Sequence, residues 1–246
     1  MRVLKGILGQ LSFFTVIPAG KVDFELVMEY AFLSPLVVGI VTGVIDYLAI
    51  LPLYLILGHL AWVLLIPVVE GVRGFNHLDG LLDFGDALMI RGTQEERRRA
   101  LRDVAVGAGG VGLLVVYLTI FYVATQVMGG TGFTTLYQLI SAEVLSRVVG
   151  LLSLSISKPM EGSSLGKAFH ERLKGKWPVL LVESVPFLSL CSLIVTAILT
   201  ILFVYAGKRV LGGSSGDLTG MAITLSFPIM LISEVKCYPF SLPHLL

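Results

Sequence analysis

The chain has 246 residues, of which 55% are hydrophobic and only 14% are charged, and its formal net charge is +1. A soluble domain carries about a quarter charged residues, so this composition excludes an ordinary water-soluble enzyme. Several long apolar runs instead predict an all-α protein, a polytopic helical bundle embedded in a lipid bilayer. The near-neutral charge gives no indication of nucleic-acid binding.

The N-terminal half contains several membrane-embedded segments. Residues 3–18 are amphipathic, and we expect an interfacial or re-entrant helix there. Residues 30–69 would form a helix about 60 Å long, roughly twice the hydrocarbon thickness of a bilayer. We therefore expect two spans with a tight turn near residues 51–58. The polar segment 70–103 follows.

Two clean spans come next, at residues 104–128 and 133–157, and a last apolar run covers residues 218–235. Between them, residues 177–206 would make a single helix about 45 Å long, which crosses a bilayer only when strongly tilted. Together the apolar stretches predict roughly six or seven membrane-embedded segments in one domain, residues 1–246.

Basic residues gather in three loops, at 91–102, 158–176 and 207–209, whereas the turn 129–132 has none. The positive-inside rule predicts that all three basic loops are cytoplasmic, in a multi-pass protein of the cell membrane. That orientation requires residues 177–206 to enter and leave on the same side, as a helical hairpin or a re-entrant pair.

The two cysteines, Cys191 and Cys237, are far apart in the sequence and lie in or next to apolar segments. Without a CxxC spacing they are expected to behave as small hydrophobic residues. Neither a disulfide framework nor a zinc site is predicted.

The most informative polar residues are Asp79, Asp83 and Asp86, spaced at i, i+4 and i+7. At helical pitch they lie within about 60° of one another, so three like charges share one stripe. A solvated loop is the simpler explanation, but interleaved leucines indicate an amphipathic helix with a carboxylate face. A hard divalent cation such as Mg²⁺, held by these three carboxylates and bridging to a phosphate, explains the stripe better.

Other candidates stand near this stripe in the sequence. His77 lies about 200° from Asp79 on a continuous helix, so it joins the stripe only if the helix begins after it. Asp103 precedes a glycine-rich segment, which alone indicates tight helix packing. Arg147 lies in the middle of an expected span, where it pairs either with Glu143 one turn earlier or with an anionic substrate.

The loop Gly212-Gly-Ser-Ser-Gly-Asp217 is the last candidate. A glycine-rich turn before a helix can bind phosphate at the helix N-terminus. Taken alone, however, such a turn more often only connects two spans, with Asp217 as an ordinary N-cap.

Taken together, these segments resemble one family. The run His77-Leu-Asp-Gly-Leu-Leu-Asp-Phe-Gly-Asp86 resembles the HLDGLxDxxD signature of the cobalamin synthase family, the adenosylcobinamide-GDP ribazoletransferases. Further segments that resemble the family's pattern follow in its order: residues 11–18, 32–43, 103–107, 146–147, 165–166 and 211–220. The chain departs from the pattern at Ser215, where the family has threonine. It also lacks the usual Ser-Arg after Asp103, so a basic phosphate contact is lost or is taken over by Arg102.

The resemblance implies a Mg²⁺-dependent transfer of the cobinamide phosphate of adenosylcobinamide-GDP to the 3′-hydroxyl of α-ribazole or its 5′-phosphate, releasing GMP. Roles for individual residues follow from the same resemblance. Asp79, Asp83 and Asp86 would hold the metal, and Asp103 or Asp217 would act as base or second metal ligand. His77 is a catalytic candidate whose role stays open. The predicted substrate-binding residues are Arg102, Arg147, Gly212, Gly213, Ser215, Gly216 and Asp217.

Two alternatives remain at the level of sequence. A CDP-alcohol phosphotransferase also uses an aspartate cluster on a membrane helix, but its pattern needs Ala-Arg where this chain has Leu82-Asp83. A cation-coupled transporter would use the stripe as an ion site, although no internal repeat is evident. Small residues at 107–112 permit a helix-mediated homodimer.

Overall fold

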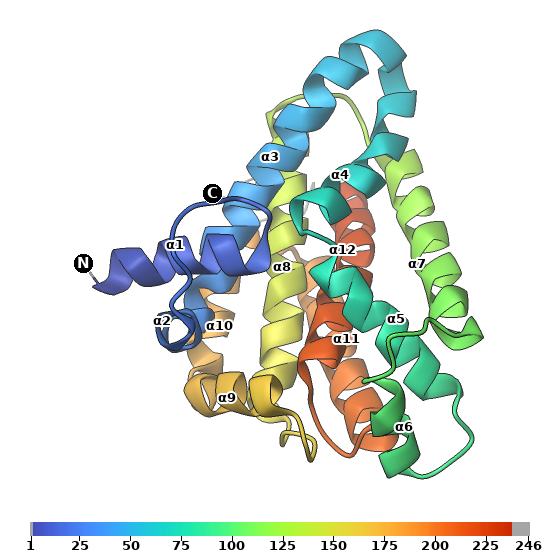
Figure 1. The fold of residues 1–246 in the computed structure, drawn as a ribbon. Coiled ribbons are helices and arrows are strands. Elements are labelled where there is room, and N and C mark those ends of the chain that lie inside the picture. The colour runs from blue at the N-terminus through green and yellow to red at the C-terminus, as the bar shows by residue number, and fades with distance from the viewer. Residues whose placement is uncertain (1, 238–246) are drawn as a thin grey trace.

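A computed structural model describes residues 2–237, and all the regular elements of this part of the chain are helices, without a β-strand (Figure 1). The all-α prediction is thereby confirmed. The helical elements are α1 (Arg2–Phe14), α2 (Phe24–Glu29), η1 (Ala31–Leu33), α3 (Ser34–Leu57), η2 (Gly58–Leu64), α4 (Leu65–Val72), α5 (Asn76–Met89), α6 (Gln94–Ala100), α7 (Ala108–Val127), α8 (Phe133–Ile156), α9 (Ser164–Leu173), α10 (Trp177–Ser184), η3 (Val185–Phe187), α11 (Leu190–Val210) and α12 (Gly216–Cys237).

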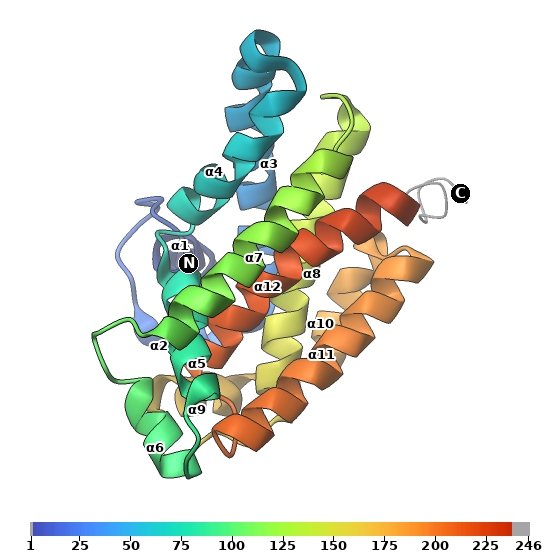
Figure 2. The same cartoon turned by 90° about the vertical axis from the view of Figure 1, so that its right-hand side faces the viewer.

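Within the described residues, 5 segments are long and apolar enough to cross a membrane, which confirms a polytopic bundle. They are Ala31–Val72, Ala108–Val127, Phe133–Ile156, Leu190–Val210 and Gly216–Cys237. Helix α8 is the central one, because 89% of its most apolar window is buried, against 28% for α7 and α11. Helices α3, α11 and α12 pack around it, as Figure 2 shows. The outer helices therefore offer apolar faces to lipid.

The first long segment folds back on itself, as its length predicts. Helix α3 ends at Leu57, and Gly58 turns the chain with a φ of 57°, a value that favours glycine. The returning arm consists of η2 and α4, which pack against α3. Helix α1, in contrast, has 13 residues and is about 20 Å long, too short to span a bilayer. Its expected interfacial position stays a prediction.

The basic loops meet at one end of the bundle, as expected. The loop after α8 and the loop before α12 form a short bridge, in which the amides of Met160 and Ser214 donate to the carbonyls of Ser214 and Lys158, each at 2.8 Å. Gln94 of α6 joins them by donating to the carbonyl of Lys208 at 3.1 Å. Residues 177–206 therefore leave and re-enter the same end, with α10 and η3 as a short first arm and α11 as the long second arm.

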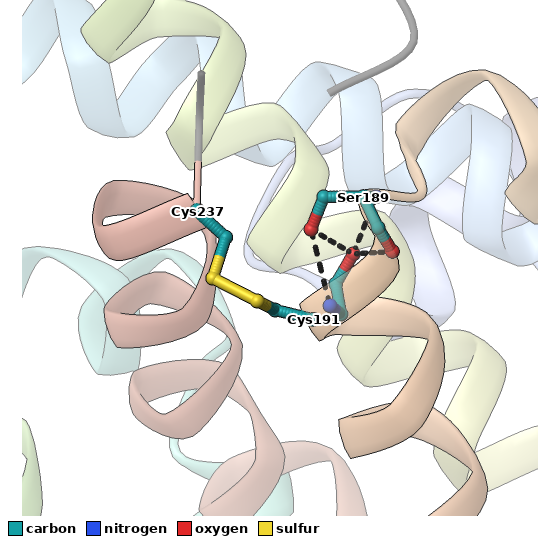
Figure 3. The surroundings of a disulfide bond; sticks show 4 residues. Ser189, Cys191 and Cys237 are labelled. Carbon is teal, nitrogen blue, oxygen red and sulfur yellow. Dashed lines mark hydrogen bonds between the residues drawn. A yellow bond between two sulfur atoms is a disulfide. The ribbon is translucent and has the colours of Figure 1, made fainter. Parts of the chain in front are cut away.

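A disulfide joins Cys191 to Cys237, with their Cα atoms 6.2 Å apart (Figure 3). The expectation of two independent thiols was wrong. Helices α11 and α12 are connected by a tight loop and run antiparallel, so the start of one lies beside the end of the other across a separation of 46 residues. Spacing along the chain cannot reveal such a pairing. The Ser189 hydroxyl caps α11 at the same end by accepting the amide of Ser192.

Candidate active site

Helices α5 and α12 cross at close range, and two glycines allow it. A Cβ on Gly80 would lie 2.6 Å from the carbonyl oxygen of Asp217, and a Cβ on Gly220 would lie 3.3 Å from the Cα of His77. Real Cβ atoms essentially never approach other atoms as closely as 2.6 Å, so Gly80 is required for this crossing. The crossing brings Asp217, at the start of α12, beside the aspartate stripe of α5.

Four carboxylates thus gather on one side of the crossing. This carboxylate cluster consists of Asp79, Asp83, Asp86 and Asp217. Partial burial is the main cause that raises the pKa of Asp83 to about 7, and the charges of its three neighbours raise it further. Among residues 2–237, no ion pair joins a member of the cluster to a lysine or an arginine. The cluster therefore carries uncompensated negative charge.

Asp86 has an additional role that sequence reasoning missed. Its carboxylate accepts the amide of Gly107, the N-cap residue of α7, at 2.7 Å, and the amide of Gly110 in the first turn of α7, at 2.9 Å. Asp86, on α5, therefore caps the N-terminus of α7, where the free N–H groups and the helix dipole favour a negative charge. The packing predicted for the glycine-rich segment is present as well, since a Cβ on Gly110 would lie 2.7 Å from the carbonyl oxygen of Leu82.

The cluster suits a hard cation in its chemistry, although it is not a complete cage. Within the described residues no group of three or more His, Cys, Asp or Glu side chains is arranged to hold a metal ion. Mg²⁺, however, usually takes one or two carboxylates and completes its octahedron with water and phosphate oxygens. The oxygen donors of Asp79 and Asp83, lying beside each other and exposed to solvent in part, fit that mode of binding.

A cavity of about 330 Å³ lies at the same crossing, lined by residues of both helices. Its hydrocarbon walls come from Phe13, Phe14, Leu151, Leu154, Leu165, Phe169 and Ile223. Its other lining residues are Ser34, Asn76, His77, Arg147, Gly166, Gly216, Asp217, Thr219 and Gly220. Because Asp217 belongs to both the cavity wall and the carboxylate cluster, the two features form one continuous site.

His77 belongs to the cavity and not to the aspartate stripe. Helix α5 already begins at Asn76, so His77 points away from Asp79, and its ring packs 6.1 Å from the ring of Phe14. Burial, followed by the positive charges of Arg73 and Arg147, lowers the pKa of His77 to about 3. The imidazole is therefore neutral at physiological pH.

Arg147 reaches the cavity from α8 and is held from behind. Its guanidinium forms an ion pair with Glu143, the pairing expected one turn earlier on the helix. Its Nη2 atom is buried without a hydrogen-bond partner, and the side chain lines the cavity. The sequence left open whether Arg147 pairs with Glu143 or contacts a ligand. The pairing with Glu143 is present, and the contact with a ligand stays a prediction.

Behind Arg147 lies a buried ion network of Asp46, Glu70, Arg73, Glu143 and Arg147. Arg73 donates to Glu143 at 2.7 Å and lies 3.6 Å from Glu70. Two hydroxyls support the carboxylates, since Thr42 donates to Glu143 at 2.9 Å and Tyr117 to Glu70 at 2.5 Å. Asp46 is fully buried beside these groups. Sequence reasoning missed the network around Arg147, although ionisable residues in apolar segments are the signal that could have found it.

The glycine-rich loop contributes mainly its last two residues to the cavity. Ser215 is the N-cap of α12, because its hydroxyl accepts the amide of Leu218 at 3.1 Å, so Asp217 is free from that role. Gly216 and Asp217 line the cavity. Gly212 has a φ of 80° and turns the chain, and Gly213 packs so closely that a Cβ would lie 2.5 Å from the carbonyl oxygen of Lys158. Gly212 and Gly213 therefore allow the turn and the close packing of this loop against the loop after α8.

Two predicted residues lie away from the cavity. Asp103 is exposed in the loop before α7, where its carboxylate accepts the amide of Ala105 at 3.1 Å. Arg102 is also exposed and donates to the carbonyl of Gly162 at 3.3 Å, which ties two basic loops together. Neither side chain is part of the cavity lining.

The cobalamin-5-phosphate synthase family model matches residues 6–234, which include every residue of the carboxylate cluster and the cavity. The chain belongs to this family. It is 48% identical over 245 residues to the adenosylcobinamide-GDP ribazoletransferase of Saccharolobus islandicus strain L.S.2.15, covering 99% of this chain and 96% of that protein. It is also similar to the proteins of the same name from Saccharolobus solfataricus, 48% identical with 98% and 99% covered, and Sulfolobus acidocaldarius, 44% identical with 97% and 95% covered. No solved structure is significantly similar to it.

Family membership confirms the resemblance that the aspartate motif indicated. It does not favour either alternative, the CDP-alcohol phosphotransferase or the transporter.

Proposed function

We propose that this chain is an adenosylcobinamide-GDP ribazoletransferase that works with Mg²⁺. The 3′-hydroxyl of α-ribazole, or of its 5′-phosphate, attacks the cobinamide-linked phosphorus. A new P–O bond forms, the bond to the bridging diphosphate oxygen breaks, and GMP leaves with that oxygen and its electron pair. The observation that carries the proposal is a carboxylate cluster that has no lysine or arginine partner among residues 2–237, joined by Asp217 to a cavity lined by Arg147.

The carboxylates would hold the metal at the diphosphate. Asp79 and Asp83 are the primary ligands in this proposal, and Asp86 contributes what its capping of α7 leaves available. A divalent cation there supplies the charge neutralisation that phosphoryl transfer requires of its diphosphate. The protein must hold the donor oxygens together against their mutual repulsion. The close crossing of α5 and α12 at Gly80 and Gly220 holds them in place.

Asp217 is the better placed of the two carboxylates considered as base. It lines the cavity and interacts with Asp83, so it can accept the proton of a hydroxyl that approaches the phosphorus from the cavity. Asp103 lies in an exposed loop and is not part of the cavity lining. Arg147 can donate its unpaired N–H to the substrate from the cavity wall.

We also propose that the site faces the cytoplasm. The three basic loops meet at the end of the bundle where α12 begins, which the positive-inside rule assigns to the cytoplasm. The disulfide joins the start of α11 to the end of α12, at the opposite end. Disulfides persist in oxidising compartments, so its position supports the same orientation.

The decisive experiment is an assay of the purified protein in detergent with adenosylcobinamide-GDP, α-ribazole and Mg²⁺. We expect GMP release that requires the acceptor, stops when EDTA removes the metal and returns when Mg²⁺ is restored. GMP release that continues in EDTA would contradict the role of the metal. No release under any of these conditions would contradict the proposed reaction.

A further inference from the structure

The cavity beside the carboxylate cluster has an unusual combination of walls for a site that acts on a nucleotide diphosphate. Three aromatic rings and four aliphatic side chains line it: Phe13, Phe14, Phe169, Leu151, Leu154, Leu165 and Ile223. The rings of Phe13 and Phe169 lie 5.9 Å apart, and those of Phe14 and Phe169 6.2 Å apart. Aromatic walls of this kind suit a flat, apolar ring system.

Its size limits what can enter. At about 330 Å³ the cavity is near the lower end of small-molecule sites and can hold a heterocycle with part of its sugar. A corrinoid is a macrocycle with many amide side chains and is far larger. Of the groups in the proposed reaction, only the guanine of the donor and the benzimidazole of the acceptor remain as occupants.

The chemistry of the walls separates these two rings. Guanine carries hydrogen-bonding groups on several edges, and placing them against hydrocarbon without partners costs free energy for each group. The dimethylbenzimidazole of α-ribazole presents two methyl groups and a single free ring nitrogen, which is an acceptor. Within residues 2–237, two side chains of the cavity lining carry buried nitrogen atoms without a hydrogen-bond partner, Nη2 of Arg147 and Nδ1 of His77. The N–H of Arg147 matches the single acceptor nitrogen of the benzimidazole.

The position of the cavity agrees with an acceptor. Asp217 stands where the cavity meets the carboxylate cluster, so a nucleoside whose base lies among the phenylalanines directs its ribose toward Asp217. The attacking hydroxyl must arrive at that point if the diphosphate is held by Asp79 and Asp83.

We propose that this cavity is the acceptor subsite. The benzimidazole base of α-ribazole packs among Phe13, Phe14 and Phe169, its free ring nitrogen accepts the Nη2–H of Arg147, and its ribose lies at Asp217. This inference rests on the proposed function and adds the substrate that occupies the cavity.

Leu151→Phe tests the assignment, because it adds volume to the wall from the buried face of α8. We expect the KM for α-ribazole to rise about tenfold and the KM for adenosylcobinamide-GDP to stay within twofold. The KM for the riboside of unsubstituted benzimidazole, which lacks the two methyl groups, should rise much less. The preference between the two acceptors therefore shifts toward the smaller one. A purely structural defect would affect both acceptors equally.

Gly216→Ala is a second filling variant that does not depend on repacking α8. Its new Cβ would meet only Leu165, at 3.9 Å, an ordinary van der Waals contact. It should shift acceptor preference in the same direction by a smaller factor. The matched control is Ile156→Phe, which adds the same ring to an exposed position on the same helix as Leu151 and should leave both KM values unchanged.

The outcomes separate the inference from the function it rests on. A wild-type protein that releases GMP, with variants that raise the KM for adenosylcobinamide-GDP instead, would assign the cavity to the donor and overturn the inference. Equal losses for both acceptors, or no change in any KM, would overturn it as well. A wild-type protein that releases no GMP with either acceptor would contradict the proposed function itself.

Discussion

The protein contains two groups of acidic side chains that are balanced in opposite ways. In the buried ion network, Glu70 and Glu143 pair with arginines, and Glu143 contacts both guanidiniums. Asp46 lies beside them without an ion pair among the described residues. In the carboxylate cluster, the described structure provides no lysine or arginine partner for any of the four aspartates. The fold of residues 2–237 therefore pairs two of three acidic groups with arginines in one place and provides no such partner in another.

We interpret this difference as one between structural charge and the charge of the proposed metal site. Buried carboxylates without partners are costly, and the network shows how this chain meets that cost with Arg73 and Arg147. At the cluster the repulsion is maintained by the close crossing of α5 and α12. Such stored repulsion is typical of sites whose missing positive charge arrives with the ligand. Each prediction below changes one of the two groups and compares stability with activity.

The largest effect is expected from Arg73→Met, which removes one cation from the buried ion network. Glu70 and Glu143 would then keep buried charge with one partner fewer, and the free energy of unfolding should fall by about 3–5 kcal/mol. Unfolding in detergent, followed by circular dichroism, measures it. The matched control is Arg172→Met on an exposed position of α9, which should change it by less than about 0.5 kcal/mol. A loss below about 1 kcal/mol for Arg73→Met would show that the network is not needed for stability.

Asp83→Asn makes the opposite change in the carboxylate cluster. It removes one of several repelling charges, so stability should be maintained or increased slightly, whereas kcat should fall at least about a hundredfold because a proposed metal ligand is lost. GMP release and thermal unfolding are measured on the same preparation. Retained activity at ordinary Mg²⁺ concentrations would remove Asp83 from the site. A loss of activity with an equal loss of stability would make the cluster a structural feature like the network.

Asp217→Asn and Asp103→Asn compare the two candidate bases. Because Asp217 lies where the cavity and the cluster meet, its substitution should lower kcat at least about tenfold, while Asp103→Asn should stay within about threefold. Steady-state rates at saturating concentrations of both substrates provide the comparison. The reverse order would place the reacting hydroxyl at the loop before α7 instead of in the cavity.

The sequence predicts those features that depend on residues close together along the chain. The spans, the turn near Gly58 and the aspartate stripe all depend on residues within a few helical turns, so hydrophobicity and spacing suffice. Asp217 joins the stripe only through close contacts at Gly80 and Gly220, more than a hundred residues apart. No periodicity marks such a contact, and only the family resemblance placed Asp217 in the site.

The network and the disulfide escaped prediction for the same reason. Arg73 and Glu143 are separated by 70 residues, and Cys191 and Cys237 by 46, so their pairing depends on which helices become neighbours. Asp86 is a related case, since its two hydrogen bonds reach the amides of another helix. The spacing of Asp86 along α5 predicted a metal ligand, but it could not predict that Asp86 also caps α7.

The smallest predicted effect concerns the metal alone, and it tests the central difference between the two groups. Mg²⁺ at about five times its Kd should raise the free energy of unfolding of the wild-type protein by about 1 kcal/mol, because it binds the folded cluster and not the unfolded chain. Asp83→Asn should abolish this shift. Arg172→Met should retain it, because Arg172 is exposed on α9 and belongs to neither group of acidic residues. Thermal unfolding with and without Mg²⁺, at matched ionic strength, measures the effect, expected at about 3 °C. If the wild-type protein and Asp83→Asn respond equally, the cation binds elsewhere, and the uncompensated charge of the cluster must then be neutralised by protons instead of a metal.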